Sequence, residues 1–328
     1  MLLVGDIGGT KTILALFKPS GRGWGCAKRT LYASADYKTF TELLAAFLLD
    51  VDAAISSVCI GVAGPVVNGD CAATNLPWIL SRDEISRSVH APNVWLLNDL
   101  EATAWGLLAL PEDDFVELNP NAVQSQVGNI AVIAAGTGLG EALMIWDGAT
   151  HRAIATEGGH ADFAPSDQQQ IGLLNHLMQK YDGHVSYERL LSGHGLVNIY
   201  DYLKQIQFAP VNISTENKML TDDPAAVIGM AGVEGNDKLC VEALNLFCRI
   251  YGAESGNLAL KCLPSAGVYL AGGIAGKIFP VLKNGEFMKG FLNKGRIKVV
   301  LENIPVKICI NADVALLGAL TFIEKMSG

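Results

Sequence analysis

The stretch LLVGDIGGTKTILALF, residues 2–17, decides the fold that we expect for the whole chain. Its two apolar runs, Leu2–Val4 and Ile13–Phe17, flank a turn that holds three glycines, an acid and two hydroxyl groups. Two strands joined by a glycine-rich loop are typical of a β-hairpin. Glycine lets such a loop bring backbone N–H groups close to an anion, although an ordinary core hairpin has the same pattern. The aliphatic segment after the loop favours a strand, whereas a P-loop would continue into a helix.

The length and composition indicate a folded α/β protein of two domains. The chain has 328 residues, of which 50% are hydrophobic and 17% charged, and a chain of this length usually exceeds one hydrophobic core. The formal net charge is −9 and no Lys/Arg cluster is present. Nucleic acid and an anionic membrane surface are therefore excluded as expected partners.

The cysteines and the N-terminus predict a soluble cytoplasmic enzyme. The seven cysteines are scattered and never stand in C-x-x-C spacing, which favours a reducing compartment over a disulfide framework or a zinc site. The N-terminus has no basic region, and Asp6 interrupts its first apolar run, so we expect no signal peptide. No apolar run reaches the length of a membrane span.

A second stretch, GNIAVIAAGTGLGEALMIW at residues 128–146, repeats the opening layout. An apolar strand, Ile130–Ala135, meets the turn Gly136–Gly140, and a second strand follows. Each half of the chain therefore begins with a hairpin that carries a Gly-Thr turn, which predicts two α/β lobes with a cleft between them. Ligand sites of α/β sheets gather at the carboxyl ends of strands.

Four glycine-rich or polar turns are expected at such strand ends: Asp6–Thr10, Asn98-Asp99, Gly136–Gly138 and Gly272-Gly273. Apolar periodicity predicts the helices around them. The expected helices cover residues 36–50, 100–110, 167–181, 237–262 and 315–326, and Ser81-x-x-Glu84 predicts a capping box that opens a further helix.

Seven motifs, in order along nearly the whole chain, resemble those of the bacterial glucokinase family, a group of actin-like ATPases. They are GDIGGTK (5–11), TNLPW (74–78), LLNDLEA (96–102), AAGTGLGEA (134–142), EGGHADFAP (157–165), ERLLSGHGLVNIY (188–200) and AGGI (271–274). The chain departs from the family at His194, where the S-G-P-G turn has proline. It also lacks the cysteine-rich zinc motif of the repressor–kinase branch, which favours the non-zinc group.

The resemblance implies a two-lobed actin-like (ribonuclease H-like) ATPase fold with a central interlobe cleft. The smaller α/β lobe would hold residues 1–110 plus 311–328, and the larger α/β lobe would hold residues 111–310. The opening loop would cradle the phosphates of ATP, and Asp6 would hold Mg²⁺. The implied nucleotide-binding residues are Gly5, Asp6, Ile7, Gly8, Gly9, Thr10, Gly136, Thr137, Gly138, Gly272 and Gly273.

The same resemblance marks Asp99 as the general base, because phosphoryl transfer to a sugar hydroxyl needs a carboxylate that orients the O–H group and accepts its proton. Its neighbour Asn98 can both donate to and accept from an adjacent hydroxyl. The family's other sugar contacts match Asn75, Glu157, His160 and Glu188. Carboxylates and imidazole suit hydroxyl groups, whose unpaired burial costs about 1–3 kcal/mol each.

The sequence therefore predicts a glucokinase, which transfers phosphate from ATP to the 6-hydroxyl of D-glucose, with a homodimer as one assembly left open. A kinase for another hexose or an N-acetylhexosamine is the alternative within enzymes. A non-catalytic sugar sensor on the same fold is the alternative outside them. A sensor would usually carry a DNA-binding helix-turn-helix before the first phosphate strand, whereas that strand begins at residue 2 here.

Overall fold

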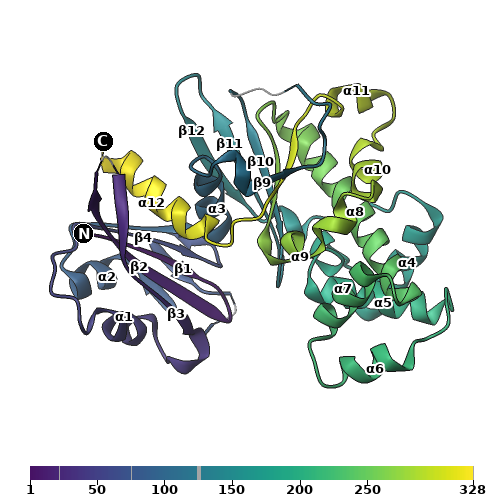
Figure 1. Cartoon of the computed structure of the whole chain (residues 1–328), viewed down its shortest axis with the longest axis horizontal. Coiled ribbons are helices and arrows are strands. Elements are labelled where there is room, and N and C mark those ends of the chain that lie inside the picture. Colours follow the sequence, from purple (N-terminus) through teal and green to yellow (C-terminus); the bar gives the residue numbers. More distant parts are fainter. Residues whose placement is uncertain (22, 75, 124–126, 328) are drawn as a thin grey trace. The chain divides into compact units, whose positions relative to one another are not determined.

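The computed structural model describes residues 1–21, 23–74, 76–123 and 127–327. The chain divides into two compact units, Met1–Glu112 with Asn311–Gly328 and Asp113–Ile310. Each unit is described here by itself. Figure 1 follows the chain by colour and shows the C-terminal helix α12 returning to the strands of the N-terminal unit.

The first unit is built on a five-stranded sheet in the order β3-β2-β1-β4-β8. β1 pairs antiparallel with β2 and parallel with β4, which in turn pairs parallel with β8. The parallel strands are almost wholly buried and rich in aliphatic residues, as expected of strands covered on both faces. The strands are β1 (Leu2–Ile7), β2 (Lys11–Ser20), β3 (Gly23–Ala33), β4 (Ser57–Val62) and β8 (Asn93–Asn98).

The expected opening hairpin is confirmed, but the turn is shorter than the sequence indicated. The ladder continues to the pair Ile7↔Thr12, so only Gly8–Thr10 lie outside the strands. Gly5, Asp6 and Ile7 belong to β1 because this strand also pairs with β4 through Ile7↔Val62. A strand that has a neighbouring strand on each side stays hydrogen-bonded to its last residue. The glycine pattern of the sequence did not show that β1 has this second neighbour.

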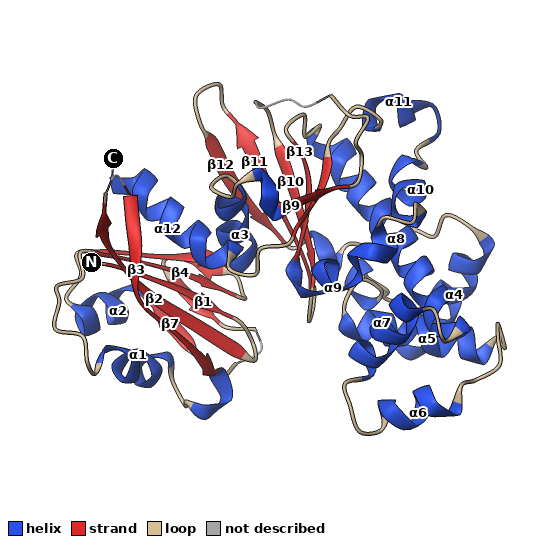
Figure 2. Cartoon of the chain, viewed as in Figure 1, coloured by secondary structure: helices blue, strands red, loops and turns tan. Residues whose placement is uncertain are grey.

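Helices cover both faces of this sheet, with α3 and α12 on one face and α1 and α2 on the other (Figure 2). A small three-stranded sheet lies in the same unit. Ser81 precedes α2, but its side chain makes no cap hydrogen bond, so the predicted capping box is wrong. The elements are α1 (Phe40–Leu48), β5 (Val66–Val67), β6 (Asp70–Ala72), β7 (Ile79–Ser81), α2 (Arg82–Val89), α3 (Asp99–Leu107) and α12 (Val314–Ser327).

The second unit repeats this topology, as the sequence predicted. Its sheet has the order β12-β11-β10-β13-β14-β9. β10 pairs antiparallel with β11 and parallel with β13, in the same way as β1 pairs with β2 and β4. The strands are β9 (Phe115–Glu117), β10 (Ile130–Ala135), β11 (Leu139–Trp146), β12 (His151–Thr156), β13 (Gly267–Ala271) and β14 (Val306–Cys309).

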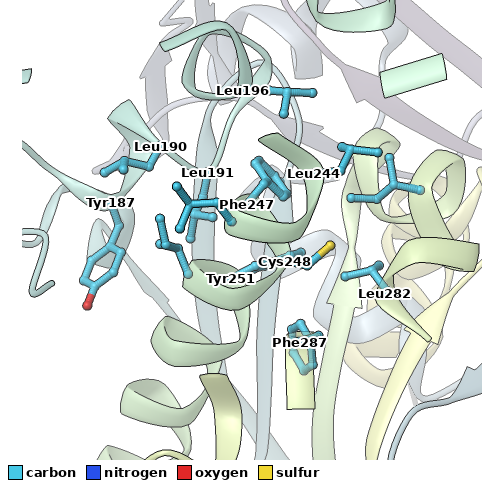
Figure 3. Close-up of a cluster of buried hydrophobic side chains, with 14 of the residues drawn as sticks. Tyr187, Leu190, Leu191, Leu196, Leu244, Phe247, Cys248, Tyr251, Leu282 and Phe287 are labelled. Atoms are coloured by element: carbon cyan, nitrogen blue, oxygen red, sulfur yellow. The ribbon is translucent and has the colours of Figure 1, made fainter. Parts of the chain in front are cut away.

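The 25-residue helix α8 runs through the core of the second unit. Figure 3 shows Phe247, Cys248 and Tyr251 of α8 among buried side chains from other helices. No described helix meets the length and hydropathy needed to cross a membrane. The helices are α4 (Gln168–Lys180), α5 (Gly193–Gln205), α6 (Ile213–Met219), α7 (Pro224–Glu234), α8 (Lys238–Cys262), α9 (Gly272–Leu282), α10 (Glu286–Leu292) and α11 (Lys298–Leu301), with single 3₁₀ turns η3 (Gly158–His160) and η4 (Tyr187–Arg189).

Candidate active site

The turn between β1 and β2 is held in place by a serine that the sequence analysis did not single out. The Gly8 N–H donates to Lys11 O at 2.9 Å and closes the turn. Ser34 then donates from its Oγ to Gly8 O at 3.1 Å and from its backbone N–H to Thr10 O at 3.0 Å. Thr12 Oγ1 lies 3.0 Å from Ser34 Oγ. These bonds fix a short glycine turn whose other backbone groups are left for a ligand.

Asn98 and Asp99 lie where β8 ends and α3 begins, as predicted. Asn98 Oδ1 accepts a hydrogen bond from the Leu100 N–H at 2.9 Å, so this side chain caps the helix. Its Nδ2 donates to Gly64 O at 3.2 Å, which leaves the amide oriented by two structural bonds. Asp99 is the first residue of α3 and is half-buried.

Three carboxyl groups of the first unit interact electrostatically at this edge of the sheet. Burial, followed by the charges of Asp99 and Asp313, raises the pKa of Asp6 from 3.8 to about 6. Asp313 is also paired with Arg29, whose Nη2 lies 2.7 Å from its Oδ1. Asp313 was missed from the sequence, because it lies in the loop between β14 and α12 and does not follow its strand directly as Asp99 follows β8.

Burial is the main cause of the raised pKa of Asp6, and the nearby charges of Asp99 and Asp313 add to it, so a divalent cation at this edge would offset part of the cost of a charged Asp6. Among the described residues, no group of three or more His, Cys, Asp and Glu side chains has the arrangement of a metal site. Mg²⁺ does not require one, since it is often held by one or two carboxylates together with substrate phosphates and water. The residues present therefore fit Mg²⁺ that arrives with a nucleotide.

In the second unit, the predicted turns Gly136–Gly138 and Gly272-Gly273 lie side by side. Gly272 has φ +83°, and a Cβ on it would meet the backbone of Ala135, the last residue of β10. Only glycine combines this conformation with such a close approach. The Gly193 N–H, at the start of α5, donates to Gly136 O at 2.9 Å. The N-termini of α5 and α9 thus flank the turn, and helix N-termini attract phosphate groups.

The departure at His194 does not disrupt this geometry. The Ser192 side chain caps α5 by accepting from the Gly195 N–H at 3.0 Å, and His194 is exposed in the first turn. The cap therefore forms without the family's proline.

Glu188, predicted as a sugar contact, is hydrogen-bonded directly beside the Gly136–Gly138 turn. Its Oε2 accepts a hydrogen bond from the Leu139 N–H at 3.1 Å. A Cβ on Gly138 would come within 2.5 Å of the same oxygen, so glycine is needed there for close packing. Glu188 is half-buried on the η4 turn and keeps its second carboxylate oxygen for a ligand.

Glu157 directly precedes the η3 turn and His160 is its last residue, and both are open to solvent. Their side chains are 67% and 57% exposed, and Oε2 of Glu157 lies 3.9 Å from Nε2 of His160. An exposed pair at this distance contributes little to stability, so both groups are available to a polar ligand. Asn75, the remaining predicted sugar contact, lies outside the described residues.

The comparisons with known proteins agree with these motifs. The family model described as glucokinase matches residues 3–326. The chain is 39% identical to a glucokinase of Nostoc punctiforme, over 97% of each chain. Among solved structures, it is similar to a glucokinase from an Antarctic psychrotroph, with a TM-score of 0.84, 26% identity and coverage of 99% of this chain and 98% of that one. A ROK family glucokinase from Streptomyces griseus, solved in complex with glucose and AMPPNP, has the same fold with a TM-score of 0.65, 21% identity and coverage of 97% of each chain.

Proposed function

This chain belongs to the glucokinase family, and from that premise we propose that it transfers the γ-phosphoryl group of ATP to the 6-hydroxyl of D-glucose, with Asp99 as the general base. The observation that carries the proposal is the family match over residues 3–326. The position of Asp99 supports its role, because a carboxylate at the junction of β8 and α3 is held rigidly. Asp99 would orient the 6-hydroxyl and accept its proton as the new O–P bond forms.

The nucleotide would be held by the two glycine turns. The N–H groups of Gly9, Thr10, Thr137 and Gly138 would contact the phosphates, in turns that the N–H groups of Gly8 and Gly136 close. Gly272-Gly273 would let the adenosine approach the backbone. Asp6 would hold Mg²⁺, which supplies positive charge to the phosphate oxygens when bound. Gly5 and Ile7 would act from within β1 by fixing Asp6, since both are buried.

The sugar would be held by Glu157, His160 and Glu188, with Asn75 and Asn98 as further contacts. The exposed Glu157 and His160 can accept from and donate to neighbouring hydroxyl groups. The free oxygen of Glu188 would take another hydroxyl while its partner oxygen stays bonded to the Leu139 N–H.

The activity is tested by measuring ADP release with ATP and Mg²⁺ against glucose, mannose, fructose and N-acetylglucosamine. We expect the highest kcat/KM with glucose and product phosphorylated at the 6-hydroxyl. A higher value with another hexose would make the chain a kinase for that sugar. Glucose binding by calorimetry without any turnover would make it a sensor.

Asp6→Asn is expected to lower the activity and to raise the stability of the fold. The variant should need more Mg²⁺ and have a lower kcat, because the carboxylate that would hold the ion is gone. The folded pKa of Asp6 is raised to about 6, so its charge destabilises the fold as the pH rises through 6. We therefore expect a melting temperature about 2–4 °C above wild type at pH 8 without Mg²⁺.

The same pKa predicts that the apparent Mg²⁺ affinity of the wild type falls as the pH is lowered through 6, because a protonated Asp6 has no charge for the ion. Titrations of Mg²⁺ against initial rate at several pH values measure this. Asp52→Asn, an exposed acid of the same unit, should change neither property. An unchanged Mg²⁺ requirement in Asp6→Asn would reduce Asp6 to a structural residue.

We further propose that the two units are the lobes of an actin-like (ribonuclease H-like) ATPase fold with the hexose in a central cleft. Chain position supports this proposal, since Asp99 belongs to the first unit and Glu157 to the second. One small hexose can contact both only if the units come together around it. Small-angle scattering should then show a smaller radius of gyration with saturating glucose, and Glu157→Ala should lose the change at that concentration. No compaction of wild type would contradict the cleft.

A cytoplasmic location and a homodimer are the remaining proposals. All seven cysteines are free thiols and six of them are buried, which suits a reducing compartment. Sedimentation of the purified chain tests the assembly.

A further inference from the structure

Two carboxyl groups without a role in the proposed reaction are buried together in the second unit. Glu141 on β11 and Glu254 on α8 are each 1% exposed. Burial and the neighbouring Glu254 raise the pKa of Glu141 to about 8. Glu141 Oε1 has no hydrogen-bond partner in the part of the chain that the structure describes. Burying two carboxyl groups together lowers the stability of the fold, so we asked which parts of the unit this pair contacts.

Glu141 packs against the turn that carries Glu157 and His160. A Cβ on Gly158 would overlap Oε2 of Glu141, so the two are in close contact. The backbone carbonyl of Glu141 accepts a hydrogen bond from Thr156 Oγ1 at 2.9 Å, and the Gly158 N–H donates to the same hydroxyl at 3.1 Å. The η3 turn is therefore seated directly on Glu141.

Glu254 contacts the segment that carries Glu188. It accepts hydrogen bonds from the Tyr187 hydroxyl and from Asn257 Nδ2, the latter at 2.9 Å. Asn257 Nδ2 also lies 3.1 Å from the Tyr187 hydroxyl. Figure 3 shows the Tyr187 side chain at the border of the buried cluster, with its hydroxyl pointing away from the cluster. Glu254 thus holds the residue that precedes Glu188 in the η4 turn.

The two turns are also joined directly through the backbone. The Tyr187 N–H donates to Ala161 O at 3.0 Å, and the Phe163 N–H donates to Val185 O at 2.9 Å. These bonds tie the two turns to each other, so a displacement of the carboxyl pair would act on both turns at once.

We propose that Glu141 and Glu254 are a pair of positioning residues that share one proton and fix the η3 turn against the η4 turn, so that hexose affinity depends on that proton. The inference rests on the proposed function, because it assumes that Glu157, His160 and Glu188 bind the sugar. The proton has a defined place, since a neutral Glu141 can donate to the Glu254 carboxylate. The charged or titratable groups that face the pair are Lys261 and Tyr251 of α8, Tyr187 of η4 and Lys294 after α10.

Like charges at this distance in a buried site cannot both be ionised without a large cost. Lys261 favours a charge on either group, whereas Lys294 and the hydrogen bond from Asn257 favour a charge on Glu254 alone, which leaves the proton on Glu141. As the pH rises through the pKa of Glu141, the pair gains a second negative charge and its hydrogen bond is lost. The two turns that rest on the pair should then shift together, and the sugar contacts that they carry should shift with them.

The test measures kcat and KM for glucose from about pH 7 to about pH 9. In wild type we expect KM to rise by roughly 10-fold across this range, because small displacements of binding groups have effects of this order, with a smaller change in kcat. Glu141→Gln keeps the shape and the donor but cannot ionise, so its KM should stay flat. Glu117→Gln, a half-buried acid on β9 of the same unit, should retain the wild-type profile.

The stability of the fold should depend on the protonation of Glu141 as well. The raised pKa makes Glu141 stabilising below the unfolded value and increasingly costly as the pH approaches 8. The melting temperature of wild type should therefore fall over this range more than that of Glu141→Gln. If the melting temperature depends on pH as expected but KM for glucose does not, the pair affects only the stability of the fold, and the proposal is overturned.

A second pair of variants does not depend on pH. Gly158→Ala forces a methyl group against the Glu141 carboxylate, and we expect a higher KM for glucose at pH 7. Glu141→Ala removes the carboxyl, so the double variant should have a lower KM than Gly158→Ala alone. Additive effects would contradict a direct contact. Failure of wild type to phosphorylate glucose would refute the proposed function, whereas normal turnover with identical pH profiles would refute only this inference.

Discussion

Asp99→Asn is expected to lower kcat for glucose phosphorylation by roughly 10²–10⁴-fold while glucose still binds. The amide has the size of the carboxyl, and its oxygen can still accept from the Leu100 N–H, the 2.9 Å bond that orients the side chain. Asn98 Oδ1 accepts from the same Leu100 N–H and is unchanged in the variant, so α3 should begin at the same residue. What the amide cannot do is take the proton of the sugar hydroxyl. Steady-state kinetics and glucose calorimetry measure the two effects separately.

The variant should also affect Asp6, since the charge of Asp99 contributes to the raised pKa of that carboxyl. Loss of this charge should move the acid limb of Mg²⁺ dependence to lower pH. Glu101→Gln makes the same change in the first turn of the same helix, and we expect near-wild-type kcat. Retention of more than a tenth of kcat in Asp99→Asn would exclude Asp99 as the base.

The sequence predicted the parts of the fold whose signal is local. The β1–β2 and β10–β11 hairpins combine apolar runs with Gly-Thr turns, and α8 has a long apolar periodicity between Asp237 and its end. β3 and β12 were not predicted. Both flank a sheet as outer antiparallel strands, and their residues are largely exposed, so they lack the apolar run that marks a buried strand.

In the candidate site, too, residues with a local sequence signal were predictable and residues placed by distant contacts were not. Asp99 was predictable because a polar pair directly follows an apolar strand, whereas Asp313 lies in the loop before α12 and has no such local signal. The role of Ser34 depends on the β2–β3 pairing, which brings a distant residue against Gly8. The contact of Glu141 with Glu254 joins residues more than a hundred positions apart, and no periodicity of either segment encodes it.

The C-terminal helix offers the sharpest test of the packing behind Asp99. α12 crosses α3 with backbone in contact: a Cβ on Gly318 would overlap Ala102 O, and a Cβ on Gly106 would overlap Val314 O. Phe322 of α12 also packs edge-on against Trp95 and Trp105, with ring centroids 5.9 and 5.8 Å away.

Helix propensity and packing predict opposite signs for Gly318→Ala. Propensity alone would stabilise the helix by about 1 kcal/mol. The overlap with Ala102 is with backbone, which cannot turn aside as a flexible side chain can, so we expect a net loss of about 3 kcal/mol. Denaturation followed by tryptophan fluorescence measures it, since Trp95 and Trp105 report the contact with Phe322. The activity should fall as well, because α3 begins at Asp99.

Gly229→Ala is the matched control, because a Cβ on this glycine of α7 would enter open space. We expect that variant to be as stable as wild type or up to about 1 kcal/mol more stable. If Gly318→Ala were stabilised to the same extent, propensity would outweigh packing at this position, and α12 could not lie against α3 as closely as the structure places it. The C-terminal helix would then not be what holds Asp99, the proposed general base, in position. A loss of stability in Gly318→Ala alone, together with changed emission of Trp95 and Trp105, would show that the packing of α12 on α3 supports the helix that begins at Asp99.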